Sequence, residues 1–224
     1  MNRNKYNISQ CLVLSNWDGG RHFLAEESSM KNFDEIINIH TSGDQIGFHK
    51  SFHYHRYEPT PYQGLEKLFS EYGLRSSDRL VDFGCGKGRL PFYIHHTFRA
   101  SAAGVEMSED FYREALENLQ TYKGEKARIS FQCILAQEYE ITPQDSHFYF
   151  FNPFSVKIFM KVVNSILLSA EENPRKMDII LYYPSEDYIF YLENSTPFEL
   201  IKEVVLEGNE NERFLVYRFN QTFD

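Results

Sequence analysis

Residues 79–89 read RLVDFGCGKGR, a short apolar run followed by three glycines at alternate positions. The apolar run is typical of a buried strand, and Gly84, Gly86 and Gly88 let the backbone turn tightly where the strand ends. The glycines also remove the Cβ atoms that would keep a ligand away from the main chain. Because a helical pattern follows and offers unpaired N–H groups, the stretch predicts a strand–loop–helix unit that binds a ligand.

Apolar runs and helical patterns alternate along the chain beyond this unit. We expect strands at residues 79–83, 102–107, 128–134, 147–151 and 177–183, and helices at 89–98, 109–122, 156–170 and 186–193. Two more alternating runs, 199–206 and 213–219, flank a polar turn. Apolar strands connected by helices predict a parallel sheet covered on both faces, whereas two strands joined by a short turn pair antiparallel. The predicted fold class is α/β, a doubly wound, mostly parallel sheet with an antiparallel C-terminal edge hairpin.

Length and composition indicate one globular domain with an extension. The chain has 224 residues, of which 42% are hydrophobic and 16% aromatic. We expect residues 1–60 to form an N-terminal extension that covers the pocket and residues 61–224 to form the ligand-binding domain. No run approaches the ~20 apolar residues of a membrane span, and the N-terminus lacks a secretory signal, so we expect a cytoplasmic protein and no membrane partner.

The net charge of the chain and the spacing of its histidines and cysteines limit which partners and metal ions we expect. The formal net charge is −9 and the basic residues are scattered, which argues against nucleic acid as a substrate. His49 and His53 are four residues apart, but no cysteine or acidic residue is spaced to complete a site, so we expect no metal. The three cysteines form no metal-spaced cluster. The sequence gives no indication of the oligomeric state.

An acidic residue ends the second expected strand. Glu106 follows the glycine loop by about 20 residues, where a carboxylate can accept the hydroxyls of a ribose. A dinucleotide site has the pattern G-x-G-x-x-G and binds a pyrophosphate. Here the pattern is G-x-G-x-G and Asp82 precedes it, which disfavours a pyrophosphate and suits a ligand that carries an ammonium and a sulfonium. The residues therefore favour S-adenosylmethionine (SAM) over NAD.

The same residues carry a family resemblance. Asp82-x-Gly84-x-Gly86-x-Gly88, followed by Gly104-Val105-Glu106, resembles the first two motifs of the class I SAM-dependent methyltransferases. The likeness extends over about residues 65–219 and includes that family's terminal hairpin. It implies that Asp82 and the three glycines line the amino-acid part of SAM, and that Glu106 binds the ribose.

The adenine-binding segment departs from the family pattern. The family often places an acidic residue after the third strand, where this chain has Leu135. We expect Ala136 and Gln137 to supply a main-chain N–H and a side-chain amide to the adenine instead, and Glu138 to lie in solvent. Lys87 and Arg89 are expected to be surface residues at the start of a helix.

The family resemblance also implies a role for the segment before the first strand. In the family, a helix such as the one that begins after Thr60-Pro61 packs beside the SAM pocket. We therefore expect Tyr57, Thr60 and Tyr62 to close over the ligand. Thr60 has the alternative role of capping that helix.

Residues 150–154, FFNPF, end the fourth strand on the ligand side. The carbonyl of Asn152 can accept an amine N–H and aim the nitrogen lone pair, and Phe154 can pack on a planar or cationic group. The stretch resembles the Asn-Pro-Pro-Phe/Tyr motif of amino-methyltransferases with one proline missing, and more weakly the Asn-Asn-Phe element of non-SET histone-lysine methyltransferases. This implies catalytic roles for Asn152 and Phe154 in N-methylation of a small molecule or protein side chain. The alternative is that Asn152-Pro153 merely ends a strand and starts a helix.

Two other classes of function stay open on the sequence alone. The missing adenine acid and the missing proline are compatible with a module that binds SAM or a nucleoside without catalysis. An NAD-dependent oxidoreductase is the other alternative, although the third glycine stands one position too early for it.

Overall fold

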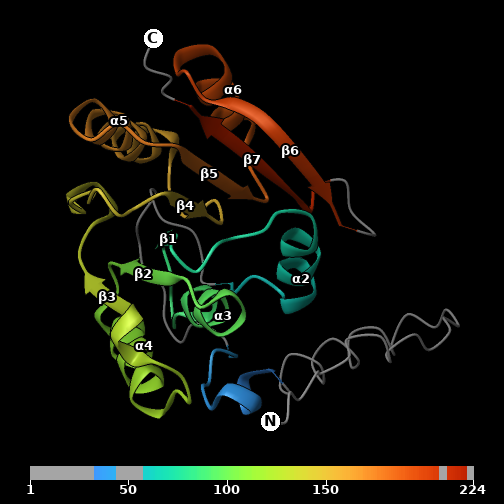
Figure 1. The fold of residues 1–224 in the computed structure, drawn as a ribbon, viewed down its shortest axis with the longest axis vertical. Helices are drawn as coiled ribbons and strands as arrows, with labels where there is room; N and C mark the ends of the chain where they lie inside the picture. Colours follow the sequence, from blue (N-terminus) through green and yellow to red (C-terminus); the bar gives the residue numbers. More distant parts are fainter. Residues whose placement is uncertain (1–32, 44–57, 207–210, 221–224) are drawn as a thin grey trace, which may run out of the picture.

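The computed structural model describes residues 33–43, 58–206 and 211–220, and its centre is a seven-stranded sheet in the order β3-β2-β1-β4-β5-β7-β6 (Figure 1). The first five strands run parallel, and β7 lies antiparallel between β5 and β6. The strands are β1 (Arg79–Phe83), β2 (Ser101–Glu106), β3 (Ile129–Cys133), β4 (His147–Phe150), β5 (Met177–Tyr182), β6 (Glu199–Val205) and β7 (Arg213–Phe219). The predicted fold class, including the antiparallel hairpin at one edge, is confirmed.

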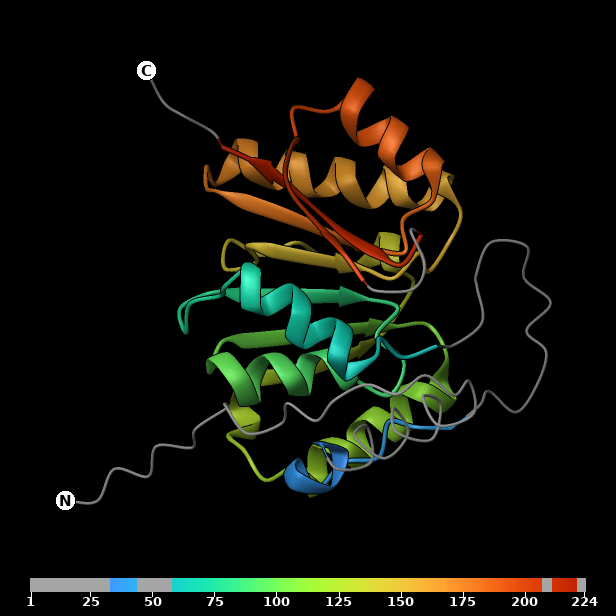
Figure 2. The same cartoon turned by 90° about the vertical axis from the view of Figure 1, so that its right-hand side faces the viewer.

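Helices cover both faces of the sheet, as the two views in Figures 1 and 2 show. Residues of α2, α3 and α4 pack on one face, and residues of α5 and α6 on the other. The helices are α2 (Tyr62–Glu71), α3 (Arg89–Phe98), α4 (Glu109–Thr121), α5 (Val156–Glu172) and α6 (Glu186–Ser195), with short 3₁₀ turns at Lys126–Arg128 and Ala136–Glu138. Within the described ranges, no helix is both long and apolar enough to cross a membrane.

Strand β1 lies in the interior of the sheet and is covered on both faces. Leu80 joins the core beneath α2 and α3, whereas Val81 and Phe83 join the core beneath α5 and α6. Successive side chains of a strand point to opposite faces, so Asp82 points to the same face as Leu80. The first carboxylate of the predicted site is therefore directed toward α2 and α3.

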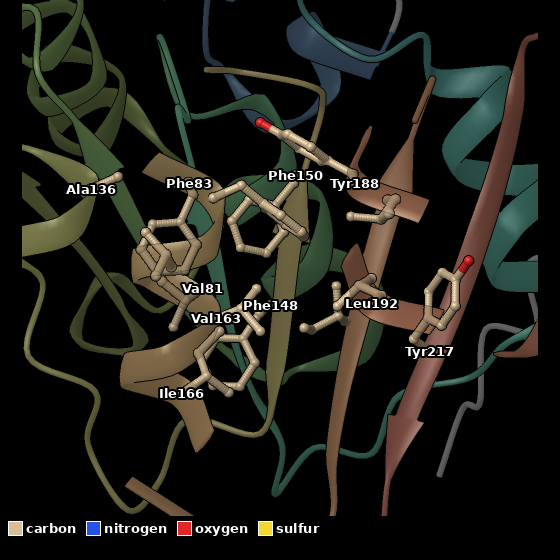
Figure 3. Packing of buried hydrophobic residues seen from close by; sticks show 14 of the residues in the cluster. Val81, Phe83, Ala136, Phe148, Phe150, Val163, Ile166, Tyr188, Leu192 and Tyr217 are labelled. Atoms are coloured by element: carbon tan, nitrogen blue, oxygen red, sulfur yellow. The ribbon is translucent and has the colours of Figure 1, made fainter. Parts of the chain in front are cut away.

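Aromatic rings fill the core between the sheet and α5 (Figure 3). The rings of Phe83 and Phe150 stack with centroids 5.0 Å apart, and Phe159 packs at 5.0 Å from Phe150 and at 3.8 Å from Tyr188. Buried aromatic side chains contribute large apolar areas. This packing holds the carboxyl ends of β1 and β4 side by side, and in open α/β sheets ligands bind at that edge.

Candidate functional site

The glycine loop turns sharply between β1 and α3. Gly84, Gly86 and Gly88 have φ values of 84°, 53° and 88°, in the left-handed region that favours glycine. The main-chain N–H groups of Gly84 and Cys85 both donate to the carbonyl of Val105, over 2.8 and 3.2 Å. The loop is thus fastened across the end of β2.

Two of these glycines also permit close packing. A Cβ on Gly88 would lie 2.7 Å from the ring of Phe131, and a Cβ on Gly84 would lie 2.8 Å from Pro153. Both separations are too short for a real side chain. The second contact places the segment that contains Asn152 directly against the glycine loop, so the two sequence motifs meet in the structure.

Glu106 lies at the end of β2 with its carboxylate turned to the loop. One carboxylate oxygen accepts from the N–H of Gly86 over 2.9 Å, and the other accepts from the N–H of Ser108 over 2.8 Å. The residue is 8% exposed. The two main-chain donors thus fix the orientation of the Glu106 carboxylate at the glycine loop.

Asp82 is the second carboxylate at the loop. It is 5% exposed and makes neither a hydrogen bond nor an ion pair within the described residues. Burial, and then the charge of Glu106, raise the pKa of Asp82 well above its usual value. The same two carboxylates and burial raise the pKa of the Cys85 thiol, burial being the largest cause. A buried carboxyl without a partner is unfavourable when ionised, and a cationic ligand would relieve that cost.

The segment after β3 is tied to the same edge of the sheet. The N–H of Ile134 donates to the carbonyl of Glu106 over 3.0 Å. Ala136 is buried, and the side-chain oxygen of Gln137 is buried with no hydrogen-bond partner in the described part of the chain. Glu138 is exposed, as expected. A buried oxygen without a partner is uncommon, and the assignment of Ala136 and Gln137 to an adenine stays a prediction.

Asn152 follows β4 with a φ of 39°, which is left-handed. Asparagine tolerates this conformation better than most residues do. Its side chain is half-buried and makes no hydrogen bond to any residue that the structure describes. The amide is therefore available to a ligand, and the catalytic role of Asn152 stays a prediction.

Phe154, the second residue expected to contact the acceptor, lies in the core. Its side chain is 2% exposed and packs in the core with its ring edge-on to Phe150 at 6.0 Å. The hydroxyl of Tyr188 donates to its carbonyl. A ring enclosed in this way has no free face, so its burial does not support the expected contact with an acceptor.

The two described residues expected to close over the ligand have internal partners. The hydroxyl of Thr60 shares a hydrogen bond with that of Tyr149 over 2.7 Å. Pro61, not Thr60, occupies the cap of α2, and no side chain caps that end, so the alternative capping role was wrong. The hydroxyl of Tyr62 donates to Asp34. Tyr57 and the candidate metal-binding residues His49 and His53 lie outside the described residues.

Lys87 and Arg89 are buried, so their expected position on the surface was wrong. Arg89 is 3% exposed and donates to the hydroxyl of Thr41 over 2.7 Å and to the carbonyl of Thr60 over 3.2 Å. Its guanidinium lies 4.7 Å from the centre of the Tyr62 ring.

The ammonium of Lys87 donates to the main-chain carbonyl of Ser42 over 3.1 Å and forms an ion pair with the carboxylate of Glu114 over 2.8 Å. Both cations fasten the glycine loop to residues 33–43.

Asp34 and Asn118 complete this attachment, which the sequence did not reveal. The carboxylate of Asp34 accepts from the N–H of Thr41 over 2.7 Å and from its hydroxyl. Asn118 on α4 accepts from the N–H of His40 over 2.7 Å and donates to the carbonyls of His40 and Lys87. Residues 33–43 therefore form a strap over the loop, held by buried polar groups.

No group of three or more potential metal ligands occurs in residues 33–43, 58–206 and 211–220. No protein-family model matches the sequence, and no curated protein matches it. Known structures do match the fold. A candidate tRNA (m1A22) methyltransferase of Streptococcus pneumoniae has 18% identity and a TM-score of 0.55 over 71% of each chain.

Two further known structures match the fold of this chain. A SAM-dependent methyltransferase of Methanosarcina mazei has 13% identity and a TM-score of 0.54, over 69% of this chain and 98% of that one. A candidate methyltransferase of Escherichia coli has 19% identity and a TM-score of 0.53, over 71% and 87%. The chain has the fold of class I methyltransferases. Because the sequence identities are below 20%, the likeness concerns the fold, and the chemistry must be argued from the residues of the site.

Arg89→Ala should loosen the strap. Loss of a buried guanidinium that donates to two oxygens is expected to reduce the free energy of unfolding by about 2–4 kcal/mol. It should also speed amide hydrogen exchange in residues 33–43, measured by mass spectrometry after urea titration has fixed the stability. Arg113→Ala is the control, because this exposed arginine pairs only within α4. Equal effects of the two variants would contradict the proposed attachment.

Proposed function

We propose that this protein is a SAM-dependent methyltransferase that methylates nitrogen. The observation that carries the proposal is the unpaired, buried carboxyl of Asp82 beside Glu106 at the glycine loop. Two carboxylates at a bend that contains three glycines repel a pyrophosphate, which argues against NAD. They attract a nucleoside that carries positive charge, and SAM has both an ammonium and a sulfonium.

The residues at the loop fit SAM part by part. Asp82 and the main chain of the glycines would hold the amino-acid portion, and Glu106 would accept the ribose hydroxyls. The unpartnered oxygen of Gln137 would accept the adenine amino group, in place of the acidic residue that is common in the family. Bound there, SAM would supply an electrophilic methyl group.

Asn152 would then orient the acceptor. Its side chain is without a partner in the described residues, and the contact between Pro153 and Gly84 places this segment against the loop. An amide oxygen that accepts one N–H of an amine turns the nitrogen lone pair in a defined direction. Methyl transfer is an in-line displacement, so this orientation supplies much of the catalysis.

The acceptor is the open part of the function. The acidic net charge favours a small molecule or a protein side chain. The S. pneumoniae neighbour, a candidate tRNA methyltransferase, makes RNA a second candidate acceptor for this chain. A module that binds SAM without catalysis is the remaining alternative, and methyl transfer distinguishes it.

Glu106→Ala should weaken SAM binding roughly 10- to 100-fold, because two hydrogen bonds to a charged group are lost. Isothermal titration calorimetry measures the affinity, and urea unfolding checks that the loop still folds without its acceptor. Glu109→Ala removes a nearby exposed carboxylate from the first turn of α4 and should leave the affinity unchanged. Unaltered SAM affinity in Glu106→Ala would refute the ribose assignment.

SAM affinity should depend on pH through Asp82. Since the pKa of Asp82 is raised in the free protein, its carboxyl binds a proton at a higher pH than an ordinary aspartate does. A cationic ligand needs the ionised form, so SAM affinity should fall as pH is lowered through that raised pKa, by up to about tenfold per pH unit. Asp82→Asn should bind SAM weakly with a flat pH profile, and should be at least as stable as the wild type at neutral pH, because it buries no charge.

Methyl transfer itself tests the class of function. We expect the purified protein to transfer tritiated methyl groups from SAM to an acceptor in a fractionated cell extract. Asn152→Gly should lower the rate by about 100-fold or more while binding SAM normally, since glycine keeps the left-handed backbone and removes only the amide that positions the acceptor. Separation into small molecules, protein and RNA identifies the acceptor. Tight SAM binding with no labelled product in any fraction would favour the non-catalytic module.

A further inference from the structure

Two neighbouring strands end in the same unusual way. The residue two positions after Phe150 in β4 is Asn152, and the residue two positions after Leu181 in β5 is Tyr183. Phe150 and Leu181 are paired in the sheet, and the rings of the next two residues, Phe151 and Tyr182, lie 4.5 Å apart. Asn152 and Tyr183 therefore leave the sheet next to each other, at the edge where the glycine loop lies.

Both residues have left-handed backbone. The φ of Asn152 is 39° and that of Tyr183 is 48°. Asparagine tolerates this region, but a bulky aromatic residue does so only at a cost, and such conformations cluster at functional sites. The N–H of Tyr183 donates to the carbonyl of Arg213 over 3.1 Å, which holds the strained residue in place.

The strained backbone presents the ring of Tyr183 to solvent. Its side chain is 40% exposed, and its hydroxyl makes no hydrogen bond within the described residues. Phe154, the aromatic residue that the motif resemblance assigns to the acceptor, is buried in the core instead. The exposed aromatic residue at this pair of strand ends is therefore Tyr183, which follows β5, and not Phe154 of the motif.

We propose that Tyr183 binds the acceptor, and that the acceptor is a planar heteroaromatic group whose nitrogen Asn152 orients. This inference rests on the proposed function and specifies its substrate class. An exposed aromatic ring stacks on any flat π-system, and base–aromatic stacking tolerates different bases. Stacking on Tyr183 would fix the plane of the acceptor ring, and the amide of Asn152 would then select which nitrogen at the edge of that ring faces the methyl group.

Charge at this edge favours a free heteroaromatic amine over a base within RNA. Burial and the carboxylates of Glu212 and Glu58 raise the pKa of Tyr182, so both acidic groups lie close to the strand end. A neutral or protonated amine tolerates these charges, whereas a phosphate backbone is repelled. Both sources share the same ring chemistry, and the experiment separates them.

The test measures acceptor binding apart from catalysis. The protein is saturated with S-adenosylhomocysteine, which fills the SAM site, and is then titrated with adenosine, cytidine and guanosine by saturation-transfer NMR. A total tRNA fraction is titrated separately by electrophoretic shift. Tyr183→Phe keeps the ring, and Tyr183→Gly removes it while relieving the left-handed backbone. Phe190→Ala removes another exposed aromatic ring, on α6, as the control.

We expect at least one nucleoside or the tRNA fraction to bind the wild type. Tyr183→Phe and Phe190→Ala should bind that probe within about twofold of the wild type, and Tyr183→Gly should bind it roughly 5- to 100-fold more weakly. Binding of nucleosides without tRNA would identify a free amine as the acceptor, and the reverse would identify RNA.

Calorimetry with S-adenosylhomocysteine and urea unfolding complete the test. All variants should bind S-adenosylhomocysteine as the wild type does, and Tyr183→Gly should be at least as stable because its backbone strain is relieved. If the wild type binds S-adenosylhomocysteine but none of the probes, or if Tyr183→Gly binds them normally, the role of Tyr183 is refuted. Failure of the wild type to bind S-adenosylhomocysteine would instead refute the proposed function.

Discussion

The structure depends on two carboxylates that are buried beside a backbone bend. Asp82 ends up inside because β1 is covered on both faces and its side chains alternate between them. Glu106 is brought to the same edge of the sheet as Asp82 because β2 pairs with β1 in parallel register. The position of Asp82 does not suit a charge in the folded protein alone, and the raised pKa of Asp82 expresses that cost. A cost of this kind is retained where a ligand of opposite charge removes it.

The bend can hold this arrangement because it is fastened from outside. Lys87 stands between Gly86 and Gly88 and Arg89 follows Gly88, yet neither pairs with Asp82 within the described residues. They are used instead to hold residues 33–43, with Asn118 closing the attachment from α4. The cations nearest in sequence are thereby directed away from the pocket. Within the described residues, Asp82 and Glu106 therefore face the loop without an ion pair to either of these two cations.

The sequence was sufficient for the fold because the signals there are local. The boundaries of β1, α3 and β7 agree with the predicted ranges, since apolar runs, glycines and polar turns act on their own segment. The meeting of the glycine loop with Asn152 was predictable, because carboxyl ends of parallel strands share one edge. The burial of Lys87 and Arg89 was not predictable. The oxygens of residues 41, 42 and 60 that accept their hydrogen bonds lie some 30 to 50 residues earlier in the chain, and no periodic pattern marks those residues.

The burial of Phe154 shows most clearly how little a motif says about the position of a side chain. Phe154 follows Asn152 by two positions, and a motif read as a string assigns both to the same task. The chain turns left-handed at Asn152, so the residues after it are directed back into the core toward Phe150 and Tyr188. The exposed ring then comes from the adjacent strand, where Tyr183 makes the same turn. Pairing between strands, which no single stretch of sequence contains, brings the ends of β4 and β5 together and makes Tyr183 the aromatic residue that we propose for the acceptor.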